Sequence, residues 1–140
     1  MTRMGADPRQ ALAVLRVAAD DGRLDALCER HGVRVLTAFG SAVRAGGEPR
    51  DLDVAVLFAP GPTADLLALL DDLARLTGSD DLDVMVLDHA GPVARERALV
   101  GCVALYESGP GVYARAQIAA VGERMDTAWL RELDLATMRS

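Results

Sequence analysis

Apolar residues recur along the chain in two patterns, one typical of helices and the other of strands. Between residues 63 and 76 the leucines follow the period of about 3.6 residues of an amphipathic helix, and Gly78 comes next as a stop. Short runs rich in β-branched and other apolar residues predict strands instead. The patterns predict helices over about 8–30, 63–76, 91–99 and 112–135, a helical turn over 42–45, and strands over 33–39, 51–58, 82–87 and 102–106.

The first helical segment carries signals for both of its ends. Asp7 is a capping residue, Pro8 suits the first helical position, and Gln10 stands at the spacing of a capping box. Gly22 is expected to split the segment into two helices, and Gly32 to stop the second. Local chemistry therefore predicts where this segment begins, divides and ends.

The order of the predicted elements indicates the fold class. Helices and strands alternate with short connections, which is typical of an α/β (α+β) fold with a single mixed β-sheet covered by helices. The strand over 82–87 is nearly continuous in apolar character, which predicts a central position in the sheet. Asp88, at the end of that strand, is expected to cap the following helix, and the aromatic residues Tyr106, Tyr113 and Trp129 are expected to pack in apolar surroundings.

Composition and charge narrow the classes of protein. The 140 residues hold 15 basic side chains, all arginines, and 21 acidic ones, for a net charge of −6 with both histidines neutral. One domain over residues 1–140 fits this length and can bury a core without disulfides. No apolar run approaches the roughly 18 residues of a membrane span, and no secretory signal is evident, so we expect a cytoplasmic protein without membrane contact. The acidic balance argues against direct nucleic-acid binding.

Three aspartates form the most informative cluster of the sequence. Asp51 and Asp53 lie two apart on a predicted strand and therefore share one face, and Asp83 begins the next strand. Converging carboxylates repel one another unless a cation lies between them. Oxygen ligands suit Mg²⁺ or Mn²⁺, and a pair of such ions is the usual device for nucleotidyl displacement on a nucleoside triphosphate. Asp81, two residues before Asp83, is the alternative third carboxylate.

A glycine and a serine end the strand that precedes this cluster. Gly40 lets the backbone approach a phosphate, and Ser41 adds a hydroxyl and backbone amides that can hold phosphate oxygens. Arg44, one turn further, can supply positive charge. Arg50 fits either a phosphate contact or a solvated loop position.

Together these segments resemble the minimal nucleotidyltransferases of the polymerase-β-like superfamily, through Phe-Gly-Ser-Ala-Val-Arg at 39–44 and Asp-Leu-Asp-Val-Ala-Val at 51–56. The resemblance covers most of the chain. It implies that Gly40 and Ser41 bind the triphosphate, that Asp51 and Asp53 bind metal, and that Asp83 completes the site and activates the attacking hydroxyl. The sequence departs from the family pattern in a spacing one residue shorter and in an arginine where a serine usually precedes the first aspartate.

So short a chain, with no separate substrate-binding domain, resembles the antitoxin of the HEPN/MNT toxin–antitoxin pairs. This implies transfer of AMP from ATP to a tyrosine hydroxyl of a HEPN ribonuclease toxin, with two Mg²⁺ ions or with Mn²⁺. Two alternatives stay open: neutralisation of the toxin by contact alone, and nucleotidyl transfer to a small molecule such as an aminoglycoside. A homo-oligomer also stays open. The contact surface or, equally, a core-facing stripe would comprise Ile118, Val121, Met125, Trp129 and Leu133.

Overall fold

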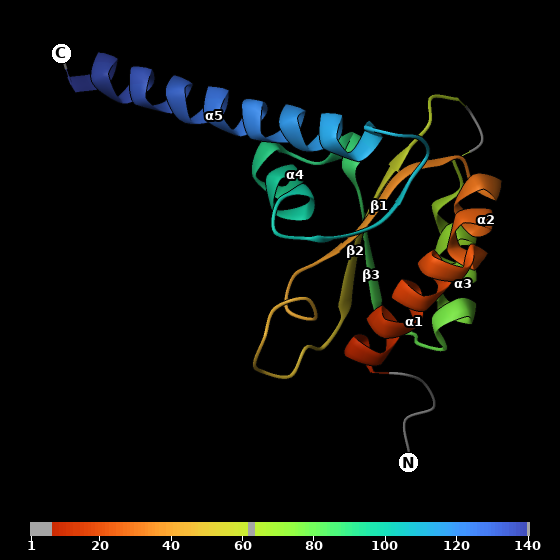
Figure 1. Cartoon of the computed structure of the whole chain (residues 1–140). Helices are drawn as coiled ribbons and strands as arrows, with labels where there is room; N and C mark the ends of the chain where they lie inside the picture. Colours follow the sequence, from red (N-terminus) through yellow and green to blue (C-terminus); the bar gives the residue numbers. More distant parts are fainter. Residues whose placement is uncertain (1–6, 62–63, 140) are drawn as a thin grey trace.

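The structure, a computed structural model, describes residues 7–61 and 64–139 and places helices on both faces of one four-stranded sheet (Figure 1). This mixed α+β architecture is the predicted fold class. The elements are α1 (Pro8–Asp21), α2 (Arg23–Arg30), β1 (Val33–Phe39), β2 (Leu52–Phe58), α3 (Leu66–Thr77), β3 (Leu82–Val86), the 3₁₀ turn η1 (Leu87–His89), α4 (Pro92–Leu99), β4 (Val103–Glu107) and α5 (Val112–Arg139). The predicted start of α3 at residue 63 lies outside the described residues.

The beginning of α1 and the break after it are confirmed in atomic detail. The Asp7 carboxylate accepts a hydrogen bond from the Gln10 amide at 2.8 Å, and the Gln10 side chain accepts one from the Asp7 amide at 3.2 Å. These bonds satisfy amides that have no partner inside the helix. Gly22 has φ of 90°, a conformation that favours glycine, and it separates α1 from α2.

The strand order differs from the prediction in one respect. The sheet runs β3-β2-β1-β4, with β1 antiparallel to both neighbours and β2 parallel to β3, so β3 is an edge strand and the predicted central position is wrong. The reason is that helices cover both faces even at this edge. Val84 and Val86 pack toward one apolar cluster, and Met85 packs toward the other. A continuous apolar run in a strand thus indicates that both faces of the strand are covered, not that the strand is central in its sheet.

Two apolar clusters lie on opposite faces of the sheet. On one face α1, α2 and α3 cover the inward side chains of β1 and β2, including Leu36 and Val54. On the other face lie α4 and α5, as Figure 1 shows, and the buried cluster there includes Phe39 and Ala55. Because side chains alternate along a strand, Asp53 shares its face with Ala55. The acidic end of β2 therefore belongs to the α4/α5 face.

Two short segments depart from the sequence expectations. Residues 42–45 form a turn without a helix. Asp88 does not cap α4: its carboxylate accepts a hydrogen bond from the Phe58 amide at 3.2 Å, and Gly91 is the N-cap without a side-chain bond. The chain passes through η1 directly after β3, and this places Asp88 beside the end of β2 instead of at the start of α4.

The last helix, α5, extends well past α4 and away from the sheet (Figure 1). Val112 and Ala120 bury against the sheet, whereas Ile118, Met125 and Trp129 are 71%, 67% and 62% exposed. The core-facing interpretation is therefore wrong for these three residues. Ile118 lies between Val112 and Ala120 on the side of α5 that faces away from the buried cluster, and Met125 and Trp129 lie further along the helix. The Leu133 side chain lies outside the described part of the structure. In the described residues, no helix has both the length and the apolar character that crossing a membrane requires.

Candidate functional site

The register of the parallel pair β2 and β3 brings two of the predicted carboxylates together. Asp53 pairs directly with Asp83, and on its other side Asp53 pairs with Phe39 at the end of β1. Directly paired residues of neighbouring strands point to the same face of a sheet. Asp51, two residues before Asp53, stands just ahead of β2. The three carboxylates thus gather at the end of the sheet from which the Gly40 turn leaves.

The electrostatics of Asp53 reflect this gathering. Burial raises the pKa of Asp53 above its ordinary value, and the carboxylates of Asp83 and then Asp51 raise it further. The guanidinium groups of Arg97 and Arg44 act in the opposite direction. Asp53 is therefore the centre of a group of interacting charges, in which negative charge is only partly balanced by arginine.

Asp81, the alternative third carboxylate, has a different role in the structure. Its backbone carbonyl accepts a hydrogen bond from the Leu52 amide at 2.8 Å, and its own amide donates to Ser79 Oγ at 3.2 Å. It is not among the charges that shift the pKa of Asp53. These observations favour Asp83 as the third carboxylate, and the assignment of its function stays a prediction.

The turn after β1 passes directly against Asp53. Gly40 has φ of 82°, and a Cβ atom on it would collide with Asp53 Oδ2 and lie 3.2 Å from Asp53 Cγ. Only glycine combines this conformation with such a close approach. The Gly40 carbonyl accepts a hydrogen bond from the Val43 amide at 3.2 Å, which closes the turn and leaves Ser41 exposed. The backbone of the turn thus lies next to Asp53, and the role of Ser41 in binding phosphate stays a prediction.

A small pocket of about 190 Å³ adjoins this turn. Arg44 and Arg97 line it together with Gly40, and no carboxylate does; the remaining lining residues are Phe39, Val100 and Gly101. Arg44 is a predicted site residue, whereas Arg97 is not predicted from the sequence. No local signal distinguishes Arg97 from the other charged residues of α4, because its place at the site results from the docking of α4 on β1.

The chemistry of the acidic group suits hard cations. Carboxylate oxygens are the ligands that Mg²⁺ and Mn²⁺ prefer, and the mutual repulsion around Asp53 is what a divalent cation would relieve. Among the side chains that the structure describes, no three histidine, cysteine, aspartate or glutamate residues are already arranged to hold a metal ion. The donor set fits such an ion, and its side chains would have to adjust to hold one.

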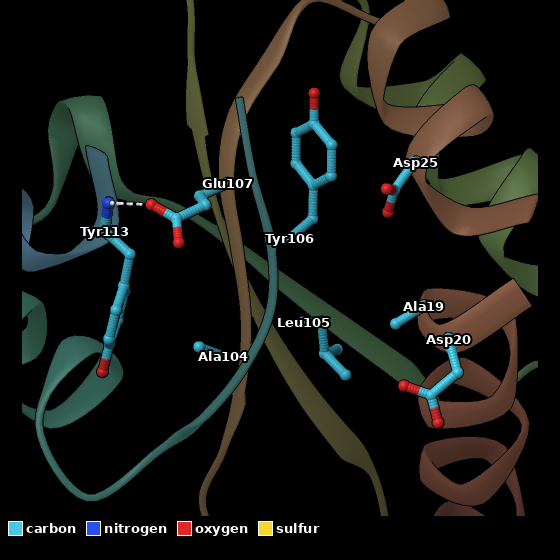
Figure 2. Close-up of a pocket in the computed structure, with 8 residues that line it drawn as sticks. All are labelled: Ala19, Asp20, Asp25, Ala104, Leu105, Tyr106, Glu107 and Tyr113. Carbon is cyan, nitrogen blue, oxygen red and sulfur yellow. Dashed lines mark hydrogen bonds between the residues drawn. The ribbon is translucent and has the colours of Figure 1, made fainter. Parts of the chain in front are cut away.

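A second pocket, of about 360 Å³, lies between β4 and the helices α1 and α2 (Figure 2). Asp20, Asp25 and Glu107 line it, and Figure 2 shows Tyr106 standing between the strand and Asp25. This acidic lining disfavours a phosphate. Tyr113, on the other side of Glu107, donates its amide to Glu107 Oε1 at 3.3 Å and its hydroxyl to the Leu99 carbonyl at 2.8 Å, so it packs as expected.

Comparisons with known proteins identify the fold. No family model matches the chain, and no curated protein matches its sequence. A solved toxin–antitoxin complex with AMP-PNP matches with a TM-score of 0.63 and 17% identity, covering 86% of this chain and 99% of that one. A tri-AMPylated HEPN toxin from Shewanella oneidensis in complex with its MNT antitoxin matches with a TM-score of 0.61 and 18% identity, covering 90% and 99%.

A third match concerns the same kind of antitoxin. It is an MntA toxin–antitoxin complex in which two aspartates two positions apart are replaced by glutamate, with a TM-score of 0.63 and 17% identity, covering 86% of this chain and 98% of that one. The fold of this chain is therefore the one that these solved toxin–antitoxin structures share. Among such proteins it matches MntA, the MNT antitoxin of MntA–HepT toxin–antitoxin complexes, as the sequence resemblance implied.

Proposed function

We propose that this chain is a single-domain, metal-dependent nucleotidyltransferase that acts as an antitoxin and transfers AMP from ATP to a tyrosine hydroxyl of a cognate HEPN toxin. The observation that carries the proposal is the group of Asp51, Asp53 and Asp83 beside the Gly40 turn. The similar solved structures support it, since one contains AMP-PNP and another an AMPylated toxin. Nucleotidyl transfer uses carboxylates that can hold metal ions beside backbone amides that can hold phosphate oxygens.

The residues of the group divide into two roles. Asp51, Asp53 and Asp83 would hold Mg²⁺, as two ions, or Mn²⁺, which would neutralise phosphate charge and stabilise the charge that develops during transfer. Gly40 and Ser41 would hold the triphosphate through backbone amides and the hydroxyl. Arg44 would add positive charge. Every cation that this chain itself supplies must be an arginine, because the sequence contains no lysine.

The proposed step exchanges one bond at phosphorus for another. The tyrosine oxygen of the toxin forms a bond to the α-phosphorus of ATP, and the bond from that phosphorus to the oxygen bridging to the β-phosphate breaks. Pyrophosphate leaves with the electron pair of that bond. The hydroxyl proton passes to the Asp83 carboxylate, which acts as general base. The products are the AMP ester of the tyrosine and pyrophosphate.

A mass measurement tests the proposal. Purified protein is incubated with ATP, MgCl₂ and the HEPN protein encoded beside it, and the intact mass of that partner is recorded. We expect the mass to rise by one or more AMP groups, and the Asp53→Asn variant to lower the rate by more than about 100-fold. Asp71→Asn, which removes an exposed carboxylate on α3 paired with Arg75, is the matched control and should act like the native chain. A partner whose mass does not change with the native protein would refute AMP transfer.

A second function, neutralisation by contact alone, is favoured by the exposed apolar side chains of α5. Ile118, Met125 and Trp129 form an apolar surface of the kind that commonly marks a protein-binding site. The Asp53→Asn variant separates the two functions. Loss of toxin neutralisation with complex formation preserved supports catalysis, whereas full neutralisation by this variant supports contact alone.

A further inference from the structure

Helix α4 is fixed to the sheet immediately beside the candidate site. The Thr37 hydroxyl on β1 donates a hydrogen bond to the Ala98 carbonyl at 2.7 Å, and both residues are fully buried. Thr37 lies on β1, three residues before Gly40 in the turn that follows this strand. A buried hydrogen bond of this kind is costly to break, because the acceptor would lose its partner without gaining water. Arg97, the residue before Ala98, is therefore held at a defined distance from the Gly40 turn.

The end of α4 is also tied to α5. The Leu99 carbonyl accepts hydrogen bonds from the Tyr113 hydroxyl at 2.8 Å and from Gln117 Nε2 at 3.1 Å, and the Leu99 side chain is fully buried. These bonds satisfy a carbonyl that has no partner within its own helix. Arg97 thus projects from a backbone that is anchored on two sides, although its own side chain is exposed.

Arg97 differs from the charged residues next to it. Arg95 Nε lies 3.7 Å from Glu123 Oε2, and Glu96 Oε2 lies 3.6 Å from Arg124 Nε, so both neighbours are engaged with α5. Among the residues whose side chains the structure describes, Arg97 has no hydrogen-bond or salt-bridge partner. Its guanidinium donors are therefore available to an external anion.

The pocket that Arg97 lines suits phosphate groups. It is bordered by Arg44 and Gly40 and has no carboxylate in its lining, in contrast to the acidic pocket in Figure 2. Its volume of about 190 Å³ is small for a nucleoside but sufficient for phosphate oxygens.

We propose that Arg97 is a second phosphate-binding arginine, which with Arg44 binds the terminal phosphates of the nucleotide and the pyrophosphate formed from them. The inference rests on the proposed function, since it assigns a residue of α4 to the same substrate. The fork of N–H donors of an arginine matches two phosphate oxygens at once. The three aspartates and the pocket lined by Arg44 and Arg97 both adjoin the Gly40 turn. A triphosphate bound at this turn would therefore have metal-binding carboxylates on one side and arginines on the other.

Nucleotide binding measured by calorimetry in MgCl₂ tests the inference. We expect Arg97→Gln to weaken ATP and ADP binding by about 10-fold or more, and AMP binding by less than about 3-fold, because AMP lacks the terminal phosphates. Arg97→Lys should lie between the native chain and Arg97→Gln, since lysine keeps the charge but not the fork. Arg75→Gln, on the exposed surface of α3, removes the same charge far from the pocket and should leave all three affinities unchanged.

The results distinguish the inference from the function on which it rests. If the native protein binds no nucleotide and transfers no AMP, the proposed function fails. If the native protein binds ATP and Arg97→Gln binds it as tightly as Arg75→Gln does, the function stands and the inference is wrong. Equal weakening of ATP and AMP also overturns the inference, because Arg97 would then not contact the terminal phosphates. Melting curves of each variant confirm that the fold is intact.

Discussion

Replacement of Gly40 by alanine separates two effects of the turn after β1. The first is conformational: at φ of 82° an L-residue is strained. The second is steric, since the new Cβ would collide with Asp53 Oδ2. Gly22→Ala provides the matched control, because Gly22 has φ of 90° but has no atom within 4 Å of the position of its added Cβ. The two variants thus share the strain, and only one displaces the carboxylate.

The expected magnitudes follow from this geometry. The left-handed conformation costs a non-glycine residue about 1–2 kcal/mol, so both variants should melt lower, by about 3–5 °C for each kcal/mol in a chain of this size. In Gly40→Ala the Asp53 carboxylate must also retreat by on the order of 1 Å to restore an ordinary contact. A displacement of that size in a catalytic group can lower a rate by about 100-fold. Gly22→Ala should therefore keep the native rate, and Gly40→Ala should not.

Two assays check this prediction. Thermal denaturation followed by circular dichroism measures the stability of both variants, and the AMP-transfer assay with the HEPN partner measures their rates. The reasoning is refuted if Gly40→Ala transfers AMP at the rate of Gly22→Ala while both remain folded. The conformational effect is refuted if Gly22→Ala melts at the native temperature, because strain at positive φ would then not lower the stability of both variants.

Three further perturbations probe the packing around the site. Thr37→Val leaves the buried Ala98 carbonyl without its hydrogen bond and should cost about 1–3 kcal/mol in the free energy of unfolding, measured by denaturant titration; an unchanged midpoint would contradict this. Trp129→Ala should change stability by less than about 0.5 kcal/mol, because the side chain is 62% exposed, while weakening capture of the toxin in a pull-down if α5 is the contact surface. The hydrogen bond between His31 and Asp72, at 2.6 Å, is the main cause that lowers the pKa of Asp72 in the folded chain. The pair therefore stabilises the fold at pH values above the unfolded-state pKa of about 3.9. This stabilisation is lost as the pH falls through the lower folded-state pKa of Asp72. The melting temperature of the native chain should accordingly fall more steeply in acid than that of Asp72→Asn, and parallel curves would count against the pair.

Predictions based on local chemistry agree with the structure most closely. The capping box of Asp7 and Gln10 and the break at Gly22 depend on bonds and backbone angles within a few residues, and both were predicted. The wrong predictions for the position of β3 and for Asp88 depend on distant segments. Asp88 was assigned to the next helix, but it bonds to the end of β2, thirty residues earlier in the chain.

The candidate site divides in the same way. The sequence by itself determined the spacing of Asp51 and Asp53 and the glycine of the turn, because alternation along a strand and the need for positive φ are properties of single segments. Only the tertiary structure decided that Asp83 lies beside Asp53 and that Arg97 faces the pocket. The physical reason is that strand register and helix docking are determined by the packing of side chains that are far apart in the chain, and no local pattern records which residues will meet.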